Sequence, residues 1–215
     1  MRRTIPGRTG GLMALAALVM ACLPTTARAQ ARGGPEPGDA QVLLTAEQAL
    51  LEIFPEARGV AVREWRPTPA ERASLEQRLS RRLYEPAYRI LLVYDDSIRF
   101  RGYALVTEER GKYRPITFMV GITPGLEVRD AAVMVYRESR GGAVRRKRFL
   151  TQYRGKTLED PIRINQDIIN ISGATISVRS MNAGVRKALA VVTAAFGGAP
   201  PPGRPSDLRP VASLR

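Results

Sequence analysis

Helix signals mark three segments of the chain. The segments 45–54 and 68–83 each open on a threonine followed three residues later by Gln or Glu, which is the capping-box pattern of a helix N-terminus. The segment 175–196 is the longest and carries one apolar stripe at helical spacing, made up of Val178, Met181, Val185, Leu189, Val192 and Phe196. We therefore expect two helices early in the domain and one long helix at its end.

Between the second and third helices the apolar positions change to runs typical of strands. Four such runs, separated by turns rich in Asp, Gly and Pro, cover 90–94, 98–107, 113–122 and 128–136, and an earlier one covers 60–65. Consecutive strands joined by short turns predict an antiparallel meander. The fold class we expect is α+β, an antiparallel sheet with flanking helices and a loop before the last helix.

The first 29 residues have the features of an export signal. Arginines precede an uncharged run over 9–27, and Ala27-Arg28-Ala29 supplies the small residues of a cleavage site. An apolar core of about a dozen residues is shorter than the ~20 that span a bilayer, so a membrane anchor fits less well. We expect a signal peptide over 1–29 and an exported chain, periplasmic or membrane-associated on the periplasmic side. Lipoprotein processing at Cys22 is the alternative.

Composition divides the remaining chain into three parts. Residues 30–44 are rich in Gly, Pro and Ala and are expected to form a flexible tether, followed by a domain over 45–196. The segment 197–215 contains many prolines and almost no large apolar residues, so we expect a disordered tail.

The residue types present exclude several kinds of chemistry. The chain has no histidine and one cysteine, so it cannot form a Ser-His nucleophile, a His-ligated metal site or an internal disulfide. Its formal net charge is +14, which would suit nucleic acid, but export separates the chain from nucleic acid, and we expect no nucleic-acid partner. The acidic pairs Asp95-Asp96 and Glu108-Glu109 are interpreted as surface charge. Redox chemistry here would require a bound cofactor.

The segment Ser172-Gly173-Ala174-Thr175-Ile176-Ser177 precedes and opens the last predicted helix. Small residues let a ligand approach the backbone, and the free N–H groups and dipole of a helix N-terminus favour an anion such as phosphate. Arg179, Arg186 and Lys187 add positive charge along the same helix. A simpler alternative is that Ser172 or Thr175 only caps the helix while Gly173 makes the turn.

This motif resembles the flavinylation motif of the FMN-binding domain family. The family includes extracytoplasmic flavoprotein subunits of the sodium-pumping NADH:quinone reductase and of the Rnf electron-transport complex. The similarity extends over 89–196, through Gly102-Tyr103, the hairpin 117–136, the stretch 136–141 and the segment 149–156. In this family a flavin transferase joins FMN through its phosphate to the motif threonine.

The resemblance implies a covalent FMN on Thr175, with Ser172, Gly173, Ala174, Ser177 and Glu138 as further cofactor-binding residues. Phe149 and Tyr153 could border the flavin ring, or could be core residues. The implied partners are a membrane electron-transfer complex or another redox protein, and a flavin transferase for maturation. The chain would act as a redox carrier or subunit rather than as a stand-alone catalyst.

One position departs from the family pattern. The family has an aspartate three residues before the motif Ser or Thr, whereas this sequence has Ile169. The alternative function is therefore a flavin-free structural or docking subunit that uses the same fold. A secreted module that binds an acidic surface is a third possibility.

Overall fold

The computed structural model describes residues 41–138, 140–197 and 204–214, all within one compact unit. The expected signal peptide, Cys22 and most of the expected tether lie outside the described residues. None of the helices within the described ranges combines the length and the hydrophobicity that a membrane span requires.

The core of the domain is a seven-stranded antiparallel sheet with the strand order β1-β6-β5-β4-β3-β2-β7. The expected meander is present, because β3 to β6 follow one another in the chain and pair as neighbours. The strands are β1 (Gln41–Val42), β2 (Gly59–Trp65), β3 (Tyr88–Tyr94), β4 (Phe100–Arg110), β5 (Pro115–Ile122), β6 (Val128–Tyr136) and β7 (Arg209–Pro210).

The helices begin where the sequence signals place them. Both α1 (Ala46–Ile53) and α2 (Pro69–Leu79) begin with complete capping boxes, at Thr45 and Thr68. The remaining helices are α3 (Lys147–Leu150) and α4 (Thr175–Phe196), with 3-10 turns at Gly142–Arg145, Thr151–Tyr153 and Val211–Leu214. The α+β class predicted from the sequence is thus confirmed.

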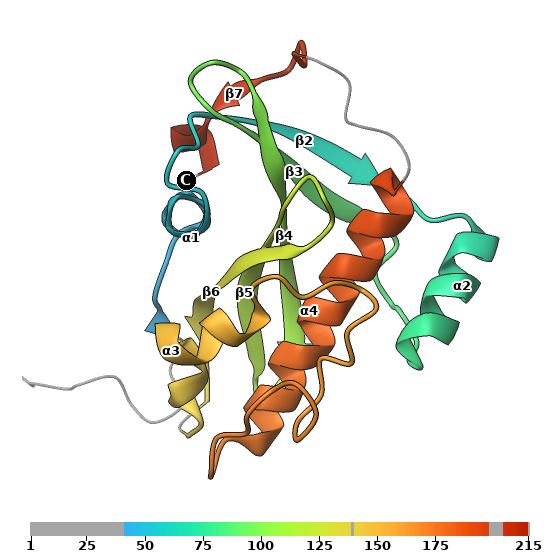
Figure 1. Ribbon diagram of the computed structural model, residues 1–215, viewed down its shortest axis with the longest axis vertical. Coiled ribbons are helices and arrows are strands. Elements are labelled where there is room, and N and C mark those ends of the chain that lie inside the picture. The colour runs from blue at the N-terminus through green and yellow to red at the C-terminus, as the bar shows by residue number, and fades with distance from the viewer. Residues whose placement is uncertain (1–40, 139, 198–203, 215) are drawn as a thin grey trace, which may run out of the picture. The chain divides into compact units, whose positions relative to one another are not determined.

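The two faces of the sheet are covered by different helices. Alternate residues of β5 divide between two apolar clusters: Phe118 packs with Val185 and Leu189 of α4, and its neighbour Met119 packs with Leu50 of α1. Figure 1 shows α4 crossing one face and α1 lying against the other. This packing fixes the N-terminus of α4 relative to β6.

Glu109, interpreted from the sequence as surface charge, and Lys187, expected to add positive charge along the last helix, are buried between α4 and β4. Lys187 and Glu109 have side chains 2% and 8% exposed, and their charged groups lie 2.9 Å apart. Lys187 also contacts Glu85 at 2.6 Å, and Arg81 of the segment after α2 contacts Glu109 at 2.7 Å. The positive charge of Lys187 is therefore neutralised inside the fold and is not available to a ligand at the start of α4.

The C-terminal segment corrects the expectation of a disordered tail for residues 204–214. Here β7 pairs with Gly59 and Val60 at the edge of β2, and the Arg63 side chain binds Asp207 at 2.7 Å. Val211 is 5% exposed. A strand pairing and one buried valine thus order a segment whose proline content suggested the opposite, because the sheet edge supplies the backbone partners that the segment lacks by itself.

Asp130 anchors the segment after β6 to the sheet and should make stability depend on acid pH. Its carboxylate accepts from Arg154 at 2.6 Å and lies 2.7 Å from Lys147. Burial raises the pKa of Asp130, but the contacts with Arg154 and Lys147 outweigh burial, so its pKa is lowered overall.

We expect the free energy of unfolding to decrease as the pH falls below about 3.9, the pKa of an unfolded aspartate. A carboxyl group whose pKa is lowered in the folded state stabilises the fold fully above the unfolded pKa. This stabilisation is lost as the pH falls through the lower, folded pKa. Asp130→Asn should be less stable at neutral pH and should lose this part of the pH dependence. Urea unfolding of both proteins from pH 3 to pH 7 measures it; parallel pH profiles would contradict the assignment.

Candidate functional site

The start of α4 lacks a side-chain cap. Ala174 is the N-cap residue and makes no side-chain capping bond, and Thr175 is the first helical residue. Gly173 has φ +76° and lies in a turn in which the backbone N–H of Ala174 donates a hydrogen bond to Ile171 O at 2.9 Å. Neither Ser172 nor Thr175 caps the helix, so the capping alternative is wrong, whereas the turn at Gly173 is present. Uncapped N–H groups of a first turn are donors that an anion can use.

The hydroxyl of Thr175 is held by a residue that the motif comparison did not identify. The Asn170 side-chain N–H donates to Thr175 Oγ1 at 3.0 Å. Asn170 Oδ1 is buried and has no hydrogen-bond partner within the described part of the chain. The Asn170 amide thus fixes the position of the hydroxyl while leaving its proton free to be donated or lost.

A hollow of ≈ 600 Å³ lies over this helix start. Five of the six predicted site residues line it, and Ser172 is exposed beside it without being part of the lining. Two cationic side chains, Lys112 and Arg140, complete the polar wall. The full lining is Lys112, Tyr113, Glu138, Arg140, Gly173, Ala174, Thr175, Ile176 and Ser177.

Hydrogen bonds fix the loops that form this wall. The Tyr136 hydroxyl donates to Arg140 O at 2.5 Å and lies 3.2 Å from Ser177 Oγ, which ties the end of β6 to the first turn of α4. Burial raises the pKa of Tyr136, so the phenol stays protonated and can donate. Glu138 Oε1 accepts the backbone N–H groups of Tyr113 and Arg114 at 2.6 and 2.8 Å.

The role of Glu138 is therefore to hold the turn between β4 and β5 that carries Lys112. Neither Lys112 nor Arg140 could be identified from the sequence, because only the folded hairpins bring them beside Thr175.

The donor set at this hollow fits a phosphate group. A phosphate needs positive charge and N–H or O–H donors, and the hollow offers the N-terminus of α4, the side chains of Lys112 and Arg140, and a hydroxyl at Thr175. Among the described residues that line the hollow, Glu138 is the one carboxylate. Its Oε1 already accepts hydrogen bonds from two backbone N–H groups.

Comparison with known proteins points to the same part of the chain. Residues 111–190 match the family model of the FMN-binding domain. The sequence resemblance to that family is thus confirmed for a region that contains every residue lining the hollow. The fold is also similar to the crystal structure of NqrC from Shewanella oneidensis, with 16% sequence identity, a TM-score of 0.49, and coverage of 73% of this chain and 93% of that chain. A comparison with curated proteins found no match.

Within the FMN-binding domain match, two aromatic candidates for the flavin ring are core residues. Phe149 is 5% exposed and Tyr153 is fully buried, with its hydroxyl donating to Asn182 Oδ1 at 2.7 Å. Ile169, at the position where the family has an aspartate, is 76% exposed, and its backbone N–H donates to Gln152 Oε1. The hydroxyl of Thr175 is instead contacted by Asn170, the next residue along the chain.

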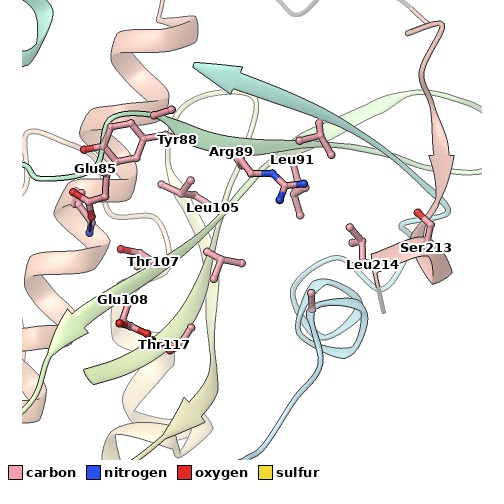
Figure 2. A pocket seen from close by; sticks show the side chains of 15 residues that line it. Glu85, Tyr88, Arg89, Leu91, Leu105, Thr107, Glu108, Thr117, Ser213 and Leu214 are labelled. Carbon is pink, nitrogen blue, oxygen red and sulfur yellow. Dashed lines mark hydrogen bonds and ion pairs between the residues drawn. The ribbon is translucent and has the colours of Figure 1, made fainter. Parts of the chain in front are cut away.

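A larger hollow of ≈ 680 Å³ lies elsewhere and contains none of the predicted site residues. Figure 2 shows Glu85 and Tyr88 at one end of it, beside α4, and Ser213 and Leu214 at the other end. Lys187 lines it, but its charge is already neutralised by Glu85 and Glu109. Arg89, labelled in Figure 2, also lines the hollow and makes no ion pair among the described residues, but the carboxylates of Glu85 and Glu108 line it too. This hollow therefore offers a phosphate one cation beside two carboxylates, and it lies partly outside the FMN-binding domain match.

Two glycines beside the site should respond differently to alanine. Both have positive φ, +82° at Gly141 and +76° at Gly173, but a Cβ on Gly141 would lie 2.5 Å from Ser177 Oγ, whereas a Cβ on Gly173 would meet nothing within 4 Å. We expect Gly173→Ala to cost about 1 kcal/mol of stability through backbone strain, and Gly141→Ala about 1–2 kcal/mol more through the clash. Urea unfolding of both variants measures the difference; equal losses would contradict the close approach of Gly141 to Ser177.

Proposed function

We propose that this chain is an exported FMN-binding electron-transfer protein that carries its flavin through a phosphoester at Thr175. The observation that carries the proposal is the position of the Thr175 hydroxyl, at an uncapped helix N-terminus facing Lys112 and Arg140, inside the region that matches the FMN-binding domain.

The chemistry of attachment requires little from the protein beyond this arrangement. Thr175 Oγ1 would form the bond to the flavin phosphorus, while the bond from that phosphorus to the nucleoside monophosphate of a flavin dinucleotide, supplied by a flavin transferase, would break. The proton of the Thr175 hydroxyl would leave with the nucleoside monophosphate. The remaining phosphodiester charge would be stabilised by the N-terminus of α4 and by Lys112 and Arg140. Asn170 would hold Oγ1 in a single orientation.

Bound FMN would supply one- and two-electron transfer, for which this chain offers neither a pair of cysteines nor a histidine to ligate a redox metal. A covalent link would prevent loss of the flavin outside the cytoplasm. The chain's own residues would bind, orient and electrostatically stabilise the cofactor. We further propose that it exchanges electrons as part of a membrane redox complex.

Denaturing electrophoresis tests the attachment. The full chain, co-expressed with a flavin transferase, should retain flavin fluorescence on the gel, and the same chain expressed without the transferase should show none. Absence of fluorescence in both samples, with the transferase shown to modify a known substrate in the same cells, would contradict the proposal.

A flavin-free docking subunit is the second candidate function. It is favoured by Ile169, an exposed apolar side chain where the family has an aspartate. The Ile169→Asp variant separates the two: if the transferase needs that carboxylate, only the variant becomes fluorescent, and the docking function is then the better description of the natural chain. Equal fluorescence of both chains would remove the main argument for the docking function.

A further inference from the structure

A second hollow along α4 is lined by arginines and lies apart from the site at Thr175. It has a volume of ≈ 320 Å³ and is formed between one face of α4 and the segment 162–164. The helix positions that face it are spaced by three or four residues, which places them on one side of α4. The lining residues are Ile162, Arg163, Ile164, Arg179, Asn182, Ala183 and Arg186, and none of them lines the hollow at Thr175.

The side chains of the three arginines in this groove form no ion pair with the described residues, although the backbone N–H of Arg163 donates to Asp167 Oδ1 at 2.8 Å. Among the residues that the structure describes, no carboxylate lies within ion-pair distance of Arg163, Arg179 or Arg186. The neighbouring Arg78 differs from them, because its side chain binds Glu159 while its carbonyl oxygen accepts from Arg186. Three guanidinium groups around one small hollow therefore form a concentration of positive charge without a counterion in the described part of the chain.

Arg186 is the least exposed of the three arginines. Its Nη2 donates to Arg78 O at 3.3 Å, while its Nε is buried without a hydrogen-bond partner among the described residues. Burial lowers the pKa of Arg186, and the like charges of Arg163 and Arg78 lower it further. An arginine remains protonated in proteins, so its N–H group and its charge both lack a partner that an anion would supply.

We propose that this groove binds a phosphate group carried by a small ester or by a lipid headgroup. Guanidinium groups present planar pairs of donors that match phosphate oxygens, and three of them face one hollow here. The volume is at the lower end of the range for small-molecule sites. Ile162 and Ile164 supply an apolar wall beside the charges, which suits a phosphate attached to an organic group. The inference is independent of flavin attachment at Thr175.

Calorimetric titration of the full chain with inorganic phosphate, at constant ionic strength, tests the site. Because the hollow at Thr175 also fits a phosphate, the starting protein should show two binding events, and Arg163→Gln combined with Arg179→Gln should weaken the one at the groove at least tenfold. Arg146→Gln combined with Arg148→Gln is the matched control, because both side chains are exposed and the change in charge is the same. The control should bind phosphate as the starting protein does, and circular dichroism should show that all variants are folded.

A third variant distinguishes the groove from the hollow at Thr175. Lys112→Gln combined with Arg140→Gln removes the same charge there, and it should retain the phosphate binding assigned to the groove. Loss of binding in this variant but not in the Arg163 and Arg179 variant would overturn the inference, as would equal binding in all proteins or no binding in the starting protein.

Co-sedimentation with vesicles identifies the source of the phosphate. If the ligand is a lipid headgroup, the starting protein and the Arg146 and Arg148 control should sediment with phosphatidylglycerol vesicles, and the Arg163 and Arg179 variant should not. If phosphate binding depends on the groove while sedimentation is the same for all three proteins, the groove binds a soluble phosphate ester.

Discussion

The Thr175→Ala variant is expected to carry no covalent flavin when it is co-expressed with the full complement of its maturation machinery. The change removes Oγ1, the atom that would bond to the flavin phosphorus, and leaves the backbone of the α4 N-terminus in place. Its fold should persist, because the hydroxyl makes one hydrogen bond within the described part of the chain, to Asn170, and such a bond contributes about 1 kcal/mol. Flavin fluorescence on a denaturing gel should fall to background.

Two conservative variants control this experiment. Thr175→Ser keeps a hydroxyl at the same position and should retain covalent flavin, whereas Ser172→Ala removes an exposed hydroxyl of the same motif and should leave labelling unchanged. Fluorescence that survives Thr175→Ala and disappears in Ser172→Ala would move the attachment to Ser172.

The second large effect is expected at Lys187. Lys187→Met removes the cation that lies 2.9 Å from Glu109, a carboxylate whose side chain is 8% exposed, and leaves Arg81 as its remaining partner. The variant leaves Arg81 to compensate the buried Glu109 carboxylate and also removes the cation that contacts Glu85, so we expect a loss of about 3 kcal/mol in the free energy of unfolding. Urea denaturation measures this loss.

Lys112→Met is the matched control, because its side chain is exposed, makes no ion pair among the described residues and contacts only the neighbouring Tyr113 ring there, at 4.8 Å. It should change stability by less than about 0.5 kcal/mol. Similar stabilities for the two variants would mean that Lys187 is not held between α4 and β4 as described.

The parts of the fold that depend on local sequence could be predicted. Thr45 and Thr68 specify helix starts through contacts within a few residues, and short turns between apolar runs specify the meander. The stripe beginning at Val178 defines the buried face of α4 over its full length.

The parts of the fold that depend on residues far apart in the sequence could not be predicted. Glu109 has the sequence context of a surface residue, and only the packing of α4 against β4 brings Lys187 to it. The strand β7 forms because the edge of β2, far away in the sequence, supplies backbone partners for Arg209 and Pro210. Single-sequence patterns carry no information on either contact.

The candidate site divides in the same way. The motif identified Thr175 and its neighbours, which are contiguous in the sequence, and the hollow contains them. Lys112 and Arg140 come from two different turns, and Asn170 stands between two isoleucines without any feature that marks it. The motif thus identifies some of the residues that would bind the phosphate. The others lie in the folded turns and can be identified only from the structure.

Intact-mass spectrometry of the chain purified from its native host tests covalent attachment at Thr175 most directly. We predict a species heavier than the polypeptide by one FMN less one water, with the added mass on the peptide that contains Thr175. A chain at its unmodified mass, with no flavin absorbance, would contradict the central claim.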